Sequence, residues 1–157
     1  MKALFAGSFD PFTVGHKAIV DRALKLYDSV VIGIGYNENK PGEWSIAQRL
    51  NAIKDLFKNE PRVSAEAYNG LTTVFMKEIA ADVLLRGVRT IQDFEYERNL
   101  ADINRETFGA ETVLLISEPR LSFISSSMIR ELIHNGFDPS HYIAGDFPLP
   151  DNLSDKF

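Results

Sequence analysis

The sequence GSFDPFTVGH, residues Gly7–His16, separates a short apolar run from an amphipathic pattern. The run Ala3–Ala6 predicts a buried strand, and the pattern that begins at His16 places its apolar residues on one helical face: Ile19, Val20, Ala23, Leu24 and Tyr27. A glycine-containing turn between a strand and a helix presents backbone N–H groups and the positive end of a helix dipole to an anion, usually a phosphate. We therefore expect the active site at this turn, with His16 beside the anion.

The same order of strand and helix repeats along the chain. Apolar runs predict strands at Lys2–Ala6, Ser29–Gly35, Arg62–Glu66, Val83–Arg86 and Thr112–Ile116. Helical patterns fall between and after them, at Gly15–Tyr27, Ser45–Lys58, Thr72–Ala80, Asp93–Thr107 and Ser125–Asn135. Short connections between such units favour right-handed crossovers. The pattern thus predicts a Rossmann-like, doubly wound α/β fold, with a five-stranded parallel sheet and helices on both faces.

Length and composition limit the class of protein. At 157 residues the chain is most simply one domain, which we place at residues 1–143. Residues 144–157 are acidic and interrupted by proline, so we expect a flexible C-terminal tail. The absence of cysteine excludes disulfides, thiolate metal sites and a cysteine nucleophile, and it fits a cytoplasmic location. A net charge of −5 and the lack of a long apolar run argue against a nucleic-acid partner and against a membrane partner.

Polar residues follow each predicted strand. Ligands of an open parallel sheet bind beyond the carboxyl ends of its strands. The residues found there are Ser8, Asp10 and His16, then Asn37 and Lys40, then Gly70 and Thr72, then Arg86 and Arg89, and finally Ser122–Ser127. Five loops that converge on one edge indicate a composite site. Lys40 is a candidate only by this placement, since most loop lysines are solvated.

The histidine and the two arginines of this edge each have an ordinary alternative. A histidine in a first helical turn is often a local cap, but Gly15 and the FDP turn favour a hydrogen bond from His16 to a phosphate oxygen. Isolated arginines are usually surface charge, yet Arg86 ends an apolar strand and offers bidentate contacts to phosphate. In LLRGVRTIQDFEYE the early carboxylates suit a helix dipole, whereas Glu97 lies where a carboxylate can hold a ribose or an amine.

The segment LSFISSSMIR, Leu121–Arg130, carries a serine triplet before an apolar helix. One serine suffices as a helix cap, so the remaining hydroxyl and N–H groups indicate a second anion site, to which Arg130 adds charge. If the triplet is only a cap, Ser126→Ala should leave nucleotide affinity unchanged. His134 and His141 have no partner at metal-ligand spacing, and we assign no metal ligands.

These groups suit transfer at phosphorus. The chain has neither G-x-x-x-x-G-K-[ST] nor a G-x-G-x-x-G after its first strand, which argues against a P-loop enzyme and a dinucleotide oxidoreductase. Catalysis at phosphorus rests mainly on positioning and charge stabilisation. A phosphate monoester with a second pKa of about 6 is largely ionised at neutral pH and needs no general base.

The motifs together resemble those of the bacterial-type phosphopantetheine adenylyltransferases, of the nucleotidylyltransferase superfamily with its TxGH and ISSS motifs. The likeness runs from Lys2 to about His141 and includes GSFDPFTVGH, GLTT, RGVR…DFEYE and LSFISSSMIR. It implies AMP transfer from ATP to 4′-phosphopantetheine, in line and without a covalent intermediate, giving dephospho-coenzyme A and pyrophosphate. It also implies Mg²⁺ as cofactor, a cytoplasmic location and a homohexamer.

The resemblance also implies roles for individual residues. His16 would be the catalytic residue, stabilising the transition state at the α-phosphate. The substrate-binding residues would be Ser8, Lys40, Thr72 and Arg86. The ATP-binding residues would be Ser8, Phe9, His16, Gly87, Val88, Arg89, Glu97, Leu121, Ser122, Phe123, Ile124, Ser125, Ser126 and Ser127. Ser8 replaces a frequent threonine of the family, and Leu121 replaces a frequent tryptophan.

Two other functions compete with this reading. One is a nucleotidylyltransferase with another acceptor, such as nicotinate mononucleotide or glycerol 3-phosphate. The other is a catalytically silent nucleotide sensor or assembly subunit, which would bind ATP but release no pyrophosphate. The presence together of His16, Lys40, Arg86 and Arg130 argues against a silent protein.

Overall fold

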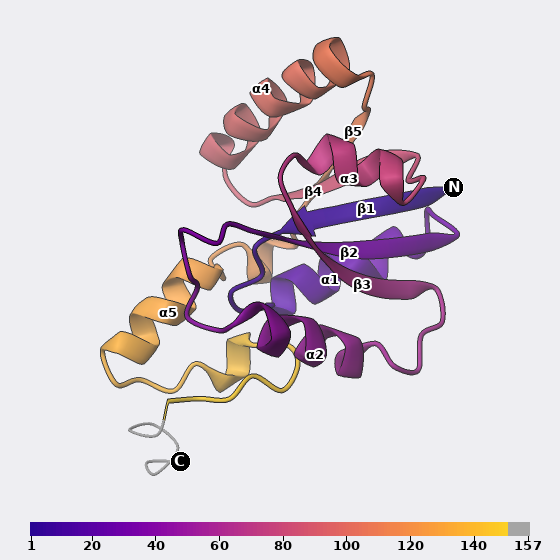
Figure 1. Ribbon diagram of the computed structural model, residues 1–157. Coiled ribbons are helices and arrows are strands. Elements are labelled where there is room, and N and C mark those ends of the chain that lie inside the picture. Colours follow the sequence, from indigo (N-terminus) through magenta and orange to yellow (C-terminus); the bar gives the residue numbers. More distant parts are fainter. Residues whose placement is uncertain (151–157) are drawn as a thin grey trace.

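The computed structural model describes residues 1–150 and contains one parallel sheet (Figure 1). Its strands lie in the order β3-β2-β1-β4-β5 and span Lys2–Gly7 (β1), Ser29–Tyr36 (β2), Val63–Asn69 (β3), Val83–Val88 (β4) and Thr112–Ile116 (β5). The α-helices between and after them are α1 (Val14–Ala23), α2 (Ile46–Leu56), α3 (Thr72–Glu78), α4 (Ile91–Phe108) and α5 (Ser126–His134). The strand order reverses at β1, as in a doubly wound fold, so the predicted fold class is confirmed.

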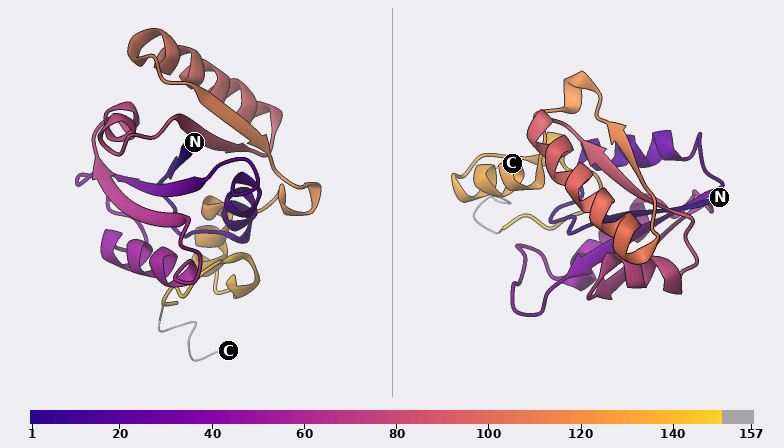
Figure 2. Two further views of the ribbon diagram at one scale, coloured as in Figure 1. Left: turned by 90° about the vertical axis from the view of Figure 1, so that its right-hand side faces the viewer. Right: turned by 90° about the horizontal axis from the view of Figure 1, so that it is seen from above.

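Helices cover both faces of the sheet (Figures 1 and 2). Helices α1, α2 and α5 pack on one face, and α3 and α4 on the other. The two faces follow from the alternation of side chains along each strand. In β1, Ala3 and Phe5 belong to the first core, whereas Leu4 and Ala6 belong to the second. All four side chains are buried, as expected for the central strand of a parallel sheet.

Local signals fix most helix starts. Ser45 caps α2, and Gln48 completes the capping box predicted there. Helix α4 begins at Ile91, two residues before the predicted start, because Thr90 accepts a hydrogen bond from the Asp93 N–H group. Helix α1 ends at Ala23 rather than Tyr27, although Leu24 and Tyr27 still pack against the core. No helix of residues 1–150 is long and apolar enough to cross a membrane.

The expected start of a loose tail at residue 144 is wrong for residues 144–150. The Ala144 N–H group donates to the Phe12 carbonyl at 3.0 Å, and the Trp44 indole donates to the Pro148 carbonyl at 2.8 Å. The Phe147 ring is buried and meets Trp44 edge to face, with ring centroids 5.5 Å apart. Two hydrogen bonds and one buried aromatic ring thus anchor a segment whose composition resembles that of a tail. Residues 151–157 lie outside the described residues.

Candidate active site

Two hollows meet at the carboxyl ends of the central strands. The His16 cavity, of about 260 Å³, lies between β1, β4, α1 and the start of α5. The Lys40 cavity, of about 1250 Å³, lies between the loop after β2, the end of β3 and α5. Gly7, Ser8 and Arg86 line both. Two ligands can therefore meet at this junction, each in its own cavity.

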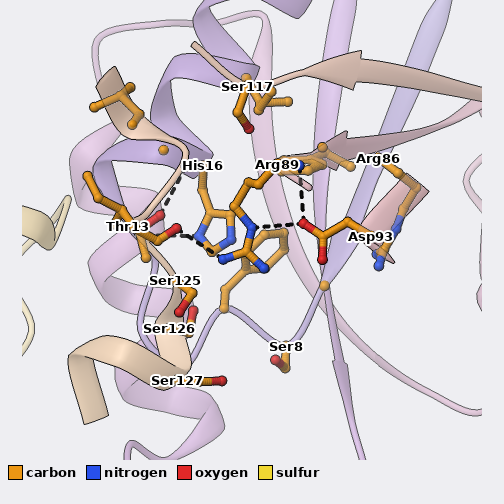
Figure 3. Close-up of a pocket in the computed structure, with 18 of the residues that line it drawn as sticks. Ser8, Thr13, His16, Arg86, Arg89, Asp93, Ser117, Ser125, Ser126 and Ser127 are labelled. Atoms are coloured by element: carbon orange, nitrogen blue, oxygen red, sulfur yellow. Dashed lines mark hydrogen bonds and ion pairs between the residues drawn. The ribbon is translucent and has the colours of Figure 1, made fainter. Parts of the chain in front are cut away.

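His16 is held in one tautomer by its own helix start. Thr13 caps α1: its side-chain oxygen accepts from the His16 N–H group at 3.1 Å, and its own N–H group donates to His16 Nδ1 at 2.9 Å (Figure 3). Because Nδ1 is the acceptor, the proton of the neutral ring is on Nε2. The Phe9 ring meets the imidazole edge to face at 5.0 Å, and Phe9 takes a positive φ of 47° in the turn. The chain thus fixes the ring and leaves Nε2–H as a donor.

The electrostatics of the pocket keep this histidine neutral. Burial, and secondarily the positive charges of Arg89 and Arg86, lower the pKa of His16 to about 3. In the free protein His16 is thus a hydrogen-bond donor at neutral pH and not a proton acceptor. A bound phosphate has the opposite effect on this pKa, because an anion favours imidazolium.

Two helices begin at the His16 cavity. Gly15 lies in the first turn of α1, and Ser125, Ser126 and Ser127 at the start of α5 line the same cavity, close to Thr13 (Figure 3). Ser125 is the cap, accepting from the Met128 N–H group at 3.0 Å, whereas the Ser126 hydroxyl donates to the Pro11 carbonyl at 2.8 Å. The triplet therefore caps α5 and also ties it to the turn before α1. Two helix starts facing one cavity form a strong anion site.

Arg86 and Glu97 form an ion pair between the cavities. Arg86 Nε donates to both Glu97 carboxylate oxygens at 2.9 and 3.0 Å, and one Arg86 terminal nitrogen donates to Glu97 Oε1 at 2.6 Å. Arg86 also donates to the Ala6 carbonyl. Glu97 is buried and accepts these hydrogen bonds from Arg86 while it lines the His16 cavity. The pair sets the angle at which Arg86 reaches the junction.

Arg89, like Arg86, lines the His16 cavity. Its Nε donates to Asp93 Oδ2 at 3.1 Å, and a terminal nitrogen donates to the Ile124 carbonyl at 3.2 Å (Figure 3). The contact joins the start of α4 to the loop before α5. Gly87 lines the cavity between the two arginines, where a Cβ would come within 3.3 Å of the Ile19 side chain.

The Lys40 cavity contains the two predicted substrate-binding residues that do not line the His16 cavity, Lys40 and Thr72. Lys40 is exposed in the loop after β2, and Thr72 begins α3. The Thr72 hydroxyl shares a hydrogen bond of 2.7 Å with the Tyr68 hydroxyl, so its side chain is already engaged. Arg130 lines this cavity rather than the His16 cavity.

The structure brings most predicted site residues together, but not all. Ser8, Phe9, His16, Gly87, Arg89, Glu97, Leu121, Ile124 and the serine triplet line the His16 cavity. Three predicted residues line neither cavity: Val88 is buried, Ser122 donates to the Pro119 carbonyl, and Phe123 packs on Tyr142. Sequence reasoning missed Thr13 and Arg49, although a threonine three residues before His16 is a capping signal.

The comparisons with known proteins agree on one family. The cytidylyltransferase-like family model matches residues 4–132. The chain is 47% identical over 142 residues to a phosphopantetheine adenylyltransferase of Bacteroides fragilis, covering 90% of this chain and 95% of that one. It is 48% identical over 147 residues to one of Porphyromonas gingivalis, covering 94% and 96%.

Solved structures with much lower identity share the fold. A bifunctional NMN adenylyltransferase/ADP ribose pyrophosphatase of Francisella tularensis, complexed with AMP and a Mn ion, superposes with a TM-score of 0.66 at 17% identity, covering 98% of this chain and 47% of that one. A lipopolysaccharide core biosynthesis protein of Thermoplasma volcanium gives 0.54 at 19% identity, covering 75% and 96%. On the family model and the identities over nearly its whole length, this chain belongs to the phosphopantetheine adenylyltransferases, within the cytidylyltransferase-like family.

Proposed function

We propose that this chain transfers AMP from ATP to 4′-phosphopantetheine, giving dephospho-coenzyme A and pyrophosphate. The observation that carries the proposal is the junction of the two cavities at Gly7, Ser8 and Arg86, in a chain that belongs to the phosphopantetheine adenylyltransferases. ATP occupies the His16 cavity, where two helix starts face its phosphates. The acceptor occupies the larger Lys40 cavity and reaches the α-phosphate across the junction.

The reaction is a single displacement at the α-phosphorus. An oxygen of the acceptor phosphate forms a bond to this phosphorus, and the bond to the oxygen that bridges to the β-phosphate breaks. Pyrophosphate leaves with that electron pair. The acceptor, with a second pKa of about 6, is already ionised at neutral pH, so no residue has to remove a proton.

His16 stabilises the charge that develops at the α-phosphate. Its Nε2–H is the free donor of a ring fixed through Nδ1 by Thr13. A preorganised donor aimed at developing charge lowers the barrier without having to reorganise during the reaction. Arg86, oriented by Glu97, supplies positive charge at the junction, and Lys40 supplies it on the acceptor side. The chain thus contributes positioning and charge.

The carboxylates near the junction determine how Mg²⁺ can be bound. Asp93 and Glu97 are paired with arginines, and Asp10 accepts backbone N–H groups. Residues 1–150 contain no cluster of three potential metal-ligating side chains. Because these carboxylates are already engaged, the site fits an Mg²⁺ ion that is coordinated mainly by ATP phosphates and water. This is the usual arrangement for Mg²⁺ with nucleotides. When bound, Mg²⁺ neutralises phosphate charge, while Arg89 and the helix starts bind the phosphates directly.

Self-association into a homohexamer is part of the same proposal. Helix α4 and strand β5 expose large apolar side chains on the outer side of the sheet, including Ile91, Tyr96 and Ile116. Exposed apolar groups of this size are typical of a surface that another subunit covers. Light scattering should give a molar mass equal to that of six chains, and a molar mass equal to that of one chain would refute the hexamer. The proposed cytoplasmic location rests on the family resemblance and is tested by cell fractionation.

The experiment that tests the activity is pyrophosphate release from ATP with Mg²⁺, with and without 4′-phosphopantetheine. We expect release only with this acceptor, and a product with the mass of dephospho-coenzyme A. Nicotinate mononucleotide and glycerol 3-phosphate serve as alternative acceptors. Release with one of these alone would refute the proposed acceptor, and ATP binding without release under any condition would indicate a nucleotide sensor.

A further inference from the structure

Asp10 is a buried carboxylate to which the proposed reaction assigns no role. It lies in the turn between β1 and α1 and is 6% exposed. Its Oδ2 accepts from the Glu43 N–H group at 2.8 Å, and its Oδ1 accepts from the Trp44 N–H group at 2.9 Å. Glu43 and Trp44 are the last two residues of the segment Asn37–Trp44, which we name the Lys40 loop. Asp10 therefore ties the turn that carries His16 to the loop that carries Lys40.

The contact between the loop and the carboxylate is close. A Cβ added to Gly42 would lie 2.5 Å from Asp10 Oδ2 and 2.9 Å from Oδ1. Real side-chain carbons do not approach oxygen so closely, so any larger residue at this position must displace the loop or the carboxylate. The backbone of the Lys40 loop at Gly42 thus packs directly against the Asp10 carboxylate.

Two arginines balance the buried charge. Arg49 Nε lies 3.8 Å from Asp10 Oδ1, and Arg130 lies 4.0 Å from Oδ2. Arg49 also donates to the Ser8 carbonyl at 2.9 Å, and Arg130 donates to the Asp10 carbonyl at 2.5 Å. A buried carboxylate needs such partners to remain charged. Helices α2 and α5 thus fix the turn from two sides, and the turn fixes the loop.

Few other contacts hold the middle of the Lys40 loop. Within it, the Lys40 N–H group donates to the Asn37 carbonyl, and the Asn39 N–H group donates to Asn37 Oδ1. Residues Glu38–Glu43 are exposed. The second end of the loop has further contacts: Glu43 Oε2 lies 2.9 Å from His134 Nε2, Arg49 Nε donates to the Trp44 carbonyl at 3.0 Å, and the buried Trp44 indole donates to Pro148. The position of Lys40 therefore depends on the end of β2 and on this anchored end, where Asp10 accepts both backbone N–H groups.

We propose that Asp10 is a positioning residue for the acceptor: by accepting the Glu43 and Trp44 N–H groups, it fixes Lys40 over the acceptor phosphate, in register with His16. This inference rests on the proposed function and deepens it. It predicts that damage to the clamp weakens use of the acceptor and spares the use of ATP, because the contacts of the His16 cavity stay in place.

The first test is Asp10→Asn. The amide keeps one acceptor oxygen but turns an NH2 group toward the second backbone N–H, so one charged hydrogen bond is lost. We expect the KM for 4′-phosphopantetheine to rise about tenfold, with the KM for ATP changed less than about twofold. Asp82→Asn is the matched control, because Asp82 accepts the Lys2 N–H group at the opposite end of the sheet. An equal rise in both KM values would overturn the proposal.

Gly42→Ala tests the clamp without altering Asp10. Its methyl group must push the loop off the carboxylate, so it should reproduce the rise in acceptor KM, even if Asp10→Asn fails to fold. In a Lys40→Met background, neither change should raise the acceptor KM by more than about twofold, since the two residues act through the same contact. Full additivity with Lys40→Met would refute action through Lys40.

Hydrogen exchange separates failure of this inference from failure of the proposed function, because it needs no substrate. In Asp10→Asn, the Glu43 and Trp44 amides should exchange at least about tenfold faster, while the amides of β1 keep their protection. Trp44 is the sole tryptophan of the chain and reports the same change by fluorescence. Unchanged exchange at both amides would overturn the clamp, whichever acceptor the enzyme uses.

Discussion

Replacement of His16 by alanine removes one donor from the proposed transition state and little else. The Nε2–H group is lost, while the helix starts at Gly15 and Ser126 still face the phosphates. Loss of one preorganised donor to a developing oxyanion costs about 3 kcal/mol, or about 10²–10³-fold in kcat. The variant also loses the acceptor of the Thr13 N–H group, which costs about 1 kcal/mol of folding stability.

The assay is steady-state pyrophosphate release, paired with ATP binding by calorimetry. We expect kcat to fall by the stated factor and the Kd of ATP to change less than about threefold. The reason is that the contacts that bind ATP equally well in the ground state and in the transition state remain in place. His141→Ala is the control, since that histidine is exposed and lines neither cavity. Urea unfolding of each variant confirms that the protein remains folded.

The pH dependence of the same variant tests how His16 acts. Because the pKa of His16 is about 3, it does not titrate between pH 5 and 9 in the free enzyme. The fall of kcat/KM below a pH of about 6 should come from the acceptor phosphate and be the same with and without His16. A kcat within about threefold of the parent, or an acidic limb that disappears in His16→Ala, would refute the proposed role.

Three further predictions concern binding and stability. Glu97→Gln removes the charge that balances Arg86, so we expect urea denaturation to show a loss of about 1–3 kcal/mol in the free energy of unfolding. Ser126→Ala removes the hydroxyl that donates to the Pro11 carbonyl, so calorimetry should show ATP affinity lower by about fivefold. Acidification from pH 7 to 5 should destabilise the protein, because the unfolded chain protonates His16 and the native state does not; this histidine contributes at most about 2 kcal/mol.

Each of these predictions has an outcome that contradicts it. An unchanged free energy of unfolding in Glu97→Gln would mean that water already screens the Arg86 pair. Unchanged ATP affinity in Ser126→Ala would mean that the serine triplet serves only as a helix cap and does not contribute to nucleotide binding. For the pH effect, His16→Ala is the control: an equal loss of stability between pH 7 and 5 in parent and variant would place the titration on another group.

The fold was predictable because each strand and helix carries its own local signal. The apolar run Ala3–Ala6 and the Ser45–Gln48 capping box both mark elements that the structure contains. Periodicity misled at the end of α1, since Leu24 and Tyr27 pack on the core from a turn. Composition misled in residues 144–150, where the buried Phe147 ring and hydrogen bonds at Ala144 and Pro148 attach residues that otherwise resemble a tail. Both errors concern tertiary contacts, which override local preference.

The location of the site was predictable from topology, but its pairings were not. Polar residues after parallel strands had to meet at one edge, and the structure places His16, Arg86 and the serine triplet there. That Glu97 pairs with Arg86 depends on how α4 crosses the sheet, and no local pattern reveals it. The same holds for Asp10, whose partners are more than thirty residues away in the sequence.

The most direct test of the account uses ATP made chiral at the α-phosphorus by a sulfur atom. The central claim is that the acceptor phosphate attacks this phosphorus directly, while the protein supplies only positions and charge. A single displacement should convert this ATP, with 4′-phosphopantetheine, into thio-substituted dephospho-coenzyme A of inverted configuration. Retention of configuration would require a covalent intermediate with the enzyme and would contradict the account, as would the absence of this product.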